Sequence, residues 1–317
     1  MIIRLLKILV SIMLIGVLLW GVDWQDIASR LRLLDPSLAI IAFILLSVQY
    51  PLSAWKWRKS LRLHGADERL GLLLRVLCIA FFFNNFLPTA IGGDAYRAYK
   101  TFDATARPAH AISAVILERL LGILALLFIG YLCAVYMVLF ETLAHRELVA
   151  TALVVTAAGA AVAAIIWYRR PWFAQRVNDR LKKVHKLEPF FCSFRTIKQN
   201  KRHLPGLVGL SLGFQALAVF IISLLFASIG IYGTLAESGF TAAASGVATV
   251  LPISINGVGV MEGSFVVAAL EAGLPYSESV LVALSLRAYM LLASVAFGIL
   301  YLFEPKRQEA LVQKAID

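Results

Sequence analysis

Residues 120–140 read LLGILALLFIGYLCAVYMVLF, a run of 21 residues without a charged side chain. A helix of about 20 residues rises roughly 30 Å, which is the thickness of the hydrocarbon layer of a bilayer. Residues 148–168 form a second uncharged run of the same length. Over the 317 residues, 60% are hydrophobic and 15% are charged, whereas soluble domains have about 25% charged residues. The sequence therefore predicts an all-α integral membrane protein without a segment long enough for a soluble catalytic domain.

The apolar runs predict about six full transmembrane helices. We expect them over residues 5–22, 37–55, 112–140, 148–168, 206–231 and 279–303. The first run follows Arg4 and Lys7 but lacks a small-residue cleavage site, so we interpret it as a retained helix and not as a signal peptide.

Two further apolar stretches, residues 76–86 and 239–251, are too short to cross the bilayer. Each ends in a cluster of Pro, Asn and Gly residues. This pattern is typical of a re-entrant hairpin, in which two half-helices enter and leave on the same side of the membrane. Irregular backbone is tolerated at that depth only where protein buries it or where it lines a wet cavity. We therefore expect two re-entrant helical hairpins beside the six spans.

The distribution of charge predicts the orientation of the chain. Residues 169–203 hold eleven Lys and Arg against two acids, and so contribute +9 of the net charge of +11. Because basic loops stay on the cytoplasmic side, this loop and both termini are expected in the cytoplasm. Phe173, Val177, Leu181 and Val184 recur at helical spacing within the loop. That spacing favours a basic amphipathic helix on an anionic lipid surface over a nucleic-acid site.

The order of these elements predicts a single transmembrane domain built as an inverted repeat. Residues 1–140 and residues 141–305 each contain span, span, hairpin and span, in opposite orientations. Residues 87–94 read LPTAIGGD and residues 251–262 read LPISINGVGVME, and an arginine follows the acid of each about 25 residues later. Inverted repeats with broken helices are typical of transporters that bind substrate where the breaks meet. Chance similarity between two Gly/Pro turns is the alternative.

Charged residues within the predicted membrane region are the candidate functional residues, since each costs at least a few kcal/mol there unless it is paired. They are Asp94, Arg97, Glu118, Arg119, Glu262 and Arg287. Arginine forks fit a phosphate, and the N-termini of the returning half-helices offer free N–H groups to an anion. We therefore expect these residues to bind the anionic part of a substrate.

Glycines and asparagines at the two breaks complete the predicted substrate site. Tight turns and close backbone approach are allowed by four glycines, Gly92, Gly93, Gly257 and Gly259. The amides of Asn84, Asn85 and Asn256 are expected to satisfy the open hairpin backbone, a role compatible with substrate contact by Asn85. Simpler roles stand beside these: Asp94 as a helix cap, Glu262 as a complement to a helix dipole, and Glu118 and Arg119 as interfacial residues.

The chemistry available to this sequence is limited in other respects. Three cysteines and five histidines are scattered without the spacing of a metal site. No Walker motif is present, so ATP is not expected to drive the protein directly. We therefore predict no metal and no cofactor.

Taken as an ordered set, five motifs resemble those of a known family, the lysylphosphatidylglycerol synthase transmembrane-region family. They are NNFLP at residues 84–88, GGDAYR at 92–97, ERLLG at 118–122, GVGVMEG at 257–263, and Arg287. The family is the flippase-like domain of the multiple peptide resistance factor proteins and their stand-alone relatives. The resemblance covers nearly the whole chain and implies lipid translocation in the bacterial inner membrane. Without an aminoacyltransferase part, synthesis of the lysyl-lipid is not implied.

The leading hypothesis is a flippase that moves a phospholipid or a lipid-linked anionic substrate across the bilayer. An intramembrane enzyme that uses Asp94 or Glu262 as a general base is the second, although no nucleophile–base pair is visible. The third is a non-catalytic partner of a lipid-biosynthetic membrane enzyme. The expected partners are membrane lipids with anionic head groups and no nucleic acid; a homodimer and a complex with a lipid-biosynthetic enzyme both stay open.

Overall fold

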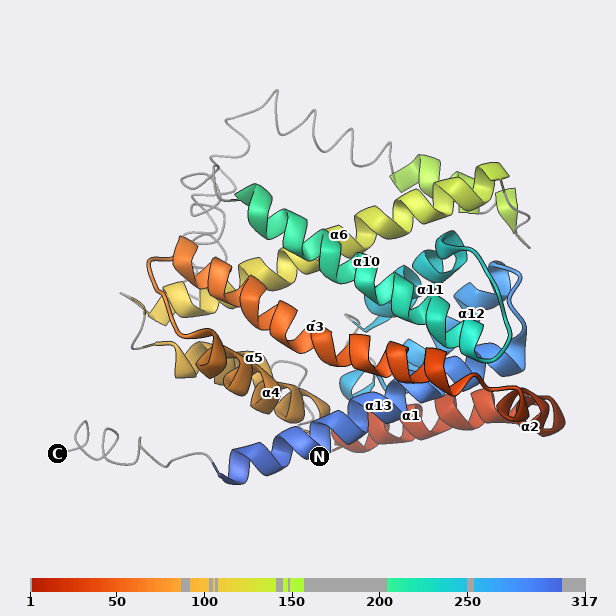
Figure 1. Ribbon diagram of the computed structural model, residues 1–317, viewed down its shortest axis with the longest axis horizontal. Helices are drawn as coiled ribbons and strands as arrows, with labels where there is room; N and C mark the ends of the chain where they lie inside the picture. Colours follow the sequence, from red (N-terminus) through yellow and green to blue (C-terminus); the bar gives the residue numbers. More distant parts are fainter. Residues whose placement is uncertain are drawn as a thin grey trace.

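The computed structural model describes residues 2–86, 92–102, 105, 108–140, 145–147, 149–156, 204–249 and 254–303. Their regular structure is helical, as the composition predicts (Figure 1). The labelled helices are α1 (Ile2–Trp20), α2 (Trp24–Arg32), α3 (Pro36–Leu63), α4 (Leu70–Phe86), α5 (Gly92–Lys100), α6 (Pro108–Phe140), α10 (Leu204–Ser228), α11 (Leu235–Ala248), the short 3-10 helix η2 (Ile255–Gly257), α12 (Val260–Glu271) and α13 (Tyr276–Leu302). Most of the predicted span at 148–168 and all of the basic amphipathic helix at 169–203 lie outside the described residues.

Four of these helices are long and apolar enough to cross a membrane, namely α3, α6, α10 and α13. Together α1 and α2 make a fifth candidate, bent by 77° between Trp20 and Trp24. The described residues thus contain four of the predicted spans and the helix expected for the first. One boundary was wrong, because α3 continues to Leu63 and does not end near residue 55. The extension is stable because the side chain of Lys56 is buried against α6, where Glu118 pairs with it.

The sequence interpretation missed α2, a helix of 9 residues with no buried residue. Its start is set by Asp23, whose carboxylate accepts hydrogen bonds from the backbone N–H groups of Gln25 and Asp26. Asp35 caps α3 in the same way, at 2.9 Å from the nitrogen of Ser37, and Pro36 occupies the first turn. The two aspartates therefore divide the region after α1 into two helices.

At the positions of the two predicted hairpins the structure has pairs of packed helices. In one, α4 packs against α5, and in the other, α11 packs against α12. The 17 residues of α4 span about 26 Å, less than the hydrocarbon thickness. Close packing of the first hairpin depends on Gly93, because a Cβ there would lie 2.1 Å from the carbonyl oxygen of Ala80. Only glycine fits that approach.

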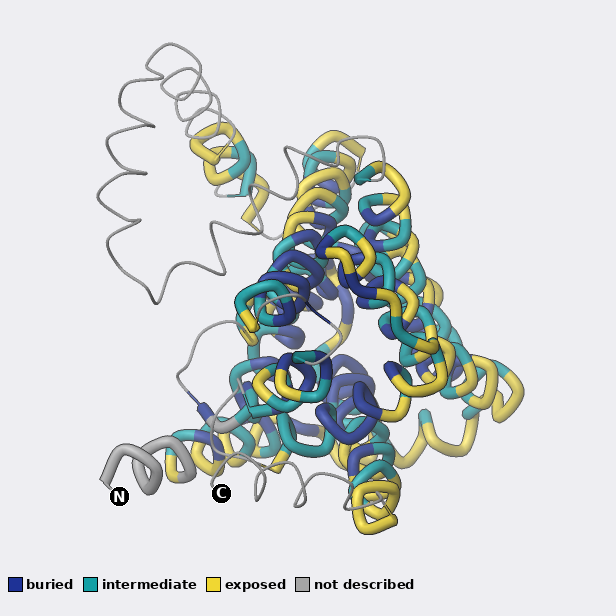
Figure 2. The backbone as a smooth tube through the Cα atoms, turned by 90° about the vertical axis from the view of Figure 1, so that its left-hand side faces the viewer, coloured by how far each residue is buried: buried dark blue, intermediate teal, exposed yellow. Residues whose placement is uncertain are grey.

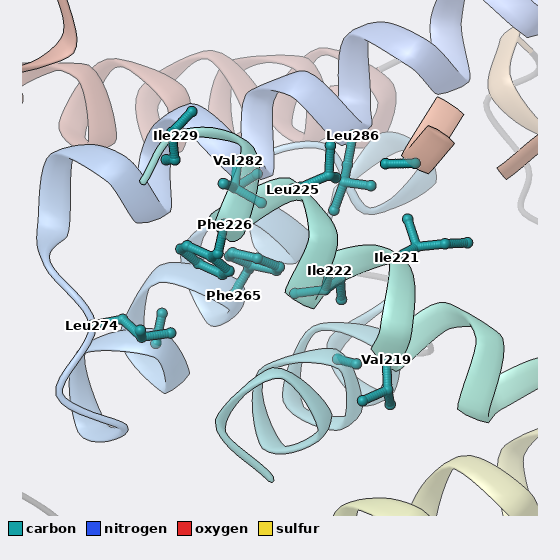
Figure 3. Packing of buried hydrophobic residues seen from close by; sticks show 14 of the residues in the cluster. Val219, Ile221, Ile222, Leu225, Phe226, Ile229, Phe265, Leu274, Val282 and Leu286 are labelled. Atoms are coloured by element: carbon teal, nitrogen blue, oxygen red, sulfur yellow. The ribbon is translucent and has the colours of Figure 1, made fainter. Parts of the chain in front are cut away.

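The core joins the hairpins to the long helices. One apolar cluster, drawn in Figure 3, is built around Phe226 of α10 and Phe265 of α12, whose rings stack with centroids 6.1 Å apart. A second cluster, around Trp57 and Leu73, joins α3, α4, α5 and α6. In Figure 2 the buried parts of the tube are gathered towards the middle of the helices, and the exposed parts lie mostly at the outside. Many exposed side chains are large and apolar, such as Phe140 and Leu292, as expected of a surface that contacts lipid.

Helices from the two halves of the chain pack against one another. The central pair is α3 with α10, and it is flanked by α4 with α13 and by α6 with α11. In addition, α1 packs on α12 and on η2. The two hairpins are therefore each held by a long helix of the other half.

Candidate functional site

A chain of five charged side chains, the first charge cluster, joins α3, α5 and α6. Glu118 lies at its centre, with one carboxylate oxygen 3.0 Å from Lys56 Nζ and the other accepting a hydrogen bond from Arg97 Nη2 at 3.1 Å. Arg97 Nη1 lies 3.6 Å from Asp94 Oδ1, and Arg119 Nε lies 2.5 Å from Asp94 Oδ2. The structure thus brings four predicted site residues together and adds Lys56, which was not among the predicted site residues.

The first charge cluster carries three cations and two acids, and hence a net charge of +1. Lys56, Arg97 and Glu118 are each no more than 5% exposed. Arg119, at the other end, is exposed over 49% of its side chain. The two buried cations of the cluster are balanced by Glu118 and Asp94, so the excess positive charge is that of the exposed Arg119. The arrangement can therefore attract an anion, with the exposed guanidinium as its first contact.

Two aromatic rings support the cations of this cluster. The guanidinium carbon of Arg97 lies 4.4 Å from the ring centroid of Trp57, and Lys56 Nζ lies 4.8 Å from that of Phe214. Such contacts stabilise desolvated cations by about 2 kcal/mol. Neither ring was predicted as part of the site; the one signal was the position of Trp57 directly after Lys56, where the apolar run ends.

A second group, the Glu262–Arg287 pair, lies at the break between α11 and α12. Arg287 Nε donates to Glu262 Oε1, and Glu262 Oε2 accepts the backbone N–H of Gly259 at 2.7 Å. Arg287 Nη2 also lies 3.4 Å from the carbonyl oxygen of Gly257. Glu262 is fully buried. In contrast to the first charge cluster, this pair is neutral and closed, and it holds the broken backbone in place.

The turn geometry at this break requires its particular residues. Gly257 and Gly259 have φ of 72° and 83°, and Asn256 has φ of 48°. Asparagine and glycine are the residues that adopt this left-handed region at low cost. A Cβ at Gly259 would also lie 2.6 Å from the Cβ of Leu14, so α1 packs directly on the turn.

Asparagines connect the two breaks. Asn84 Oδ1 accepts the backbone N–H of Gly93 at 2.8 Å, which closes the first hairpin. Asn256 Nδ2 donates to Asn85 Oδ1 at 2.5 Å, across 171 residues of sequence. The amide of Asn84 therefore satisfies hairpin backbone as predicted, whereas the amide of Asn256 binds the side chain of Asn85 and links the two breaks.

The two acid–arginine pairs share one pattern. Asp94 pairs with Arg119 and Glu262 pairs with Arg287, each through the Nε atom and each at a separation of 25 residues. The sequence correspondence between the two halves aligned these four residues. Gly92 begins α5, so the predicted glycines lie at the hairpin turns or beside them.

The charged groups of the described residues are arranged as donors to an anion. Within the described ranges, no group of three His, Cys, Asp or Glu side chains could hold a metal ion. The acids of both groups are engaged by arginines or by backbone N–H groups. What the geometry offers is a chain of guanidinium and ammonium donors suited to an anionic oxygen ligand.

Comparison with known proteins gives one family. Residues 4–298 match the family model described as the lysylphosphatidylglycerol synthase TM region. The match includes both hairpins, the first charge cluster and the Glu262–Arg287 pair, and it confirms the resemblance seen in the motifs. No curated protein matches the chain.

Proposed function

The chain belongs to the lysylphosphatidylglycerol synthase transmembrane-region family, and from this membership we propose that it moves an anionic phospholipid, or a related lipid-linked anion, across the bilayer. The observation that carries the proposal is the net positive first charge cluster, which begins at exposed Arg119 and ends at buried Lys56. A lipid phosphate would supply the missing negative charge while the acyl chains stay in the hydrocarbon.

The position of the cluster along α6 fits contact with lipid head groups. Residues 120–140, which are uncharged, follow Arg119 directly and are long enough to cross the hydrocarbon layer. Arg119 would then lie at one end of that layer. With the basic loop of residues 169–203 and both termini in the cytoplasm of a bacterium, the cluster would face the inner leaflet of the plasma membrane. Arg287 lies near the middle of α13 and would be deeper in the membrane.

The packing of the helices supports an inverted repeat of residues 1–140 and 141–305. If α3, α4, α5 and α6 correspond to α10, α11, α12 and α13, a two-fold operation maps the pair α4–α13 onto the pair α11–α6 and leaves α3–α10 unchanged. The shared spacing of the two acid–arginine pairs agrees with this correspondence. In such an architecture the breaks meet at the substrate path.

In the mechanism we propose, the arginines recognise the phosphate and the acids balance their charge. Arg119 releases Asp94 and binds a phosphate oxygen of the lipid. Arg97 then binds the same phosphate. The Glu262–Arg287 pair is a second binding site for the phosphate, near the middle of the membrane. Protonation of Asp94 or Glu262 would release its arginine and provides a route for coupling to a proton gradient.

Reconstitution tests this proposal. Purified protein in liposomes should equilibrate a fluorescently labelled phosphatidylglycerol between leaflets, as measured by accessibility to a membrane-impermeant quencher. Arg97→Ala and Arg119→Ala should each lower the rate at least tenfold. Arg69→Ala, an exposed arginine outside both charged groups, is the matched control and should transport at the unaltered rate. Equal rates in all four proteins would remove the site assignment, and liposomes that form a new lipid species would indicate an enzyme.

A further inference from the structure

Two hydrogen-bond donors in the first charge cluster are buried without an acceptor. Trp57 Nε1 and Arg97 Nε have no hydrogen-bond partner among the described residues. Trp57 is fully buried and Arg97 is 5% exposed. A buried N–H group without an acceptor costs free energy, so native structures almost always provide a partner for it. The Arg97 guanidinium lies over the Trp57 ring, so both donors belong to neighbouring side chains.

The two buried cations beside these donors share their acids, and Asp94 Oδ1, 3.6 Å from Arg97 Nη1, is also buried without a hydrogen-bond partner. Lys56 and Arg97 share the single carboxylate of Glu118, at 3.0 and 3.1 Å. Each of these cations could pair with a carboxylate of its own. The next acid, Asp94, pairs with both Arg97 and the exposed Arg119. Two buried donors without acceptors thus lie beside two buried cations that share one carboxylate.

We infer that Trp57 and Lys56 bind the anionic oxygens of the substrate together with Arg97, and that Glu118 is an internal anion that occupies part of this position when substrate is absent. An entering phosphate would accept from Trp57 Nε1 and Arg97 Nε and would displace Glu118 from Lys56. The choice of a lipid as the source of the phosphate rests on the proposed function; the anion site itself does not require translocation.

The chain provides matched controls on the same helix. Lys59 and Trp55 lie on α3 outside the cluster and contact each other, with Lys59 Nζ 5.4 Å from the Trp55 ring. Lys56→Met and Lys59→Met remove the same charge, and Trp57→Phe and Trp55→Phe remove the same indole N–H. A difference in affinity between the two variants of a pair is therefore caused by where the residue lies, since both variants lose the same chemical group.

Binding is measured on the purified full chain in a non-ionic detergent. Three probes are titrated: short-chain phosphatidylglycerol, the matching diacylglycerol, which lacks phosphate, and inorganic phosphate. We expect phosphatidylglycerol to bind and diacylglycerol not to bind. Lys56→Met and Trp57→Phe should weaken the affinity about tenfold or more, and the two controls should stay within about twofold. Inorganic phosphate competing as strongly as the lipid would assign the site to the free anion.

Glu118→Gln separates the internal-anion role from a purely structural one. The neutral amide should lower the melting temperature without ligand, because it leaves Lys56 and Arg97 without a counter-charge. It should also tighten phosphatidylglycerol binding about tenfold, and the melting temperature should recover as the lipid is added. Weaker binding in Glu118→Gln would overturn the internal-anion role, and equal effects in cluster and control variants would overturn the site. If the variants change binding as expected but liposomes show no translocation, the proposed function is refuted and the anion site stands.

Discussion

Replacement of Arg287 by methionine should destabilise the protein strongly. Methionine keeps much of the side-chain volume but removes the guanidinium that pairs with Glu262. Because Glu262 is fully buried, its carboxylate would be left without a counter-charge and without water. Removal of one partner from a buried ion pair costs about 3–5 kcal/mol.

Hydrogen bonds that remain in the variant place the expected cost within this range. Glu262 keeps the hydrogen bond from the Gly259 N–H at 2.7 Å, which satisfies one of its two oxygens. The hydrogen bond from Arg287 to the Gly257 carbonyl oxygen is long, at 3.4 Å, so its removal adds little. We therefore expect about 3 kcal/mol, the lower end, which shifts the unfolding equilibrium about a hundredfold.

The double variant Glu262→Gln/Arg287→Met tests the electrostatic cause. A neutral amide oxygen can still accept the Gly259 N–H, and no buried charge remains. The double variant should therefore recover about 2 kcal/mol or more relative to Arg287→Met alone. Recovery on this scale would show that an unpaired charge, and not poorer packing, causes the effect.

Reversible unfolding in mixed micelles, followed by the fluorescence of the native tryptophans, measures these differences. Leu292→Met, at an exposed position of the same helix, is the control and should change stability by less than about 0.5 kcal/mol. The reasoning is refuted if Arg287→Met costs less than about 1 kcal/mol, or if the double variant is no more stable than the single one.

Three other changes have defined outcomes. Gly93→Ala would place a Cβ 2.1 Å from a backbone oxygen; it should cost about 1–3 kcal/mol in the same unfolding assay and open the first hairpin to cysteine labelling. His64, which follows α3, is buried with Nδ1 2.8 Å from the Ser60 carbonyl oxygen, and burial lowers its pKa below 6.5. Because the unfolded chain then binds the proton more readily, stability is complete above pH 6.5 and falls as the pH drops below this value. Melting temperatures from about pH 7 to pH 5 should therefore decline more steeply in the native protein than in His64→Gln; parallel curves would contradict this. Thr234→Ala removes the hydroxyl that accepts the Glu237 N–H at 3.2 Å at the start of α11; it should cost about 1 kcal/mol, whereas Thr249→Ala, beyond the end of that helix, should cost less.

Hydropathy and the positions of helix-breaking residues predicted those parts of the fold that depend on a single segment. The uncharged runs of α6 and α10 and the Pro/Asn/Gly clusters at both breaks are features of single segments. The short helix α2 was missed because its 9 residues are too few for a periodic signal, although Asp23 as a helix cap was a readable sign of it. The end of α3 was misplaced because the free energy that extends it comes from another helix.

The sequence identified most charged residues of the candidate site but not which of them pair with each other. The charged residues were identified because charge within a membrane is costly, and in both motifs the acid pairs with the arginine 25 residues later. The pairing of Lys56 with Glu118 depends on how α3 and α6 are rotated and shifted against each other. One sequence contains no direct signal for that register, so Lys56 was not predicted as part of the site.

The amide contact between Asn85 and Asn256 makes the two halves of the molecule mechanically interdependent. It is a side-chain bridge across 171 residues, from the end of α4 to η2. If one hairpin moves against the other, this hydrogen bond has to stretch or break. The bond therefore adds an energy threshold to the motion. A side chain too short to reach across, as in Asn85→Ala, would lower that threshold, while the packing of each hairpin on a long helix of the other half would still couple them.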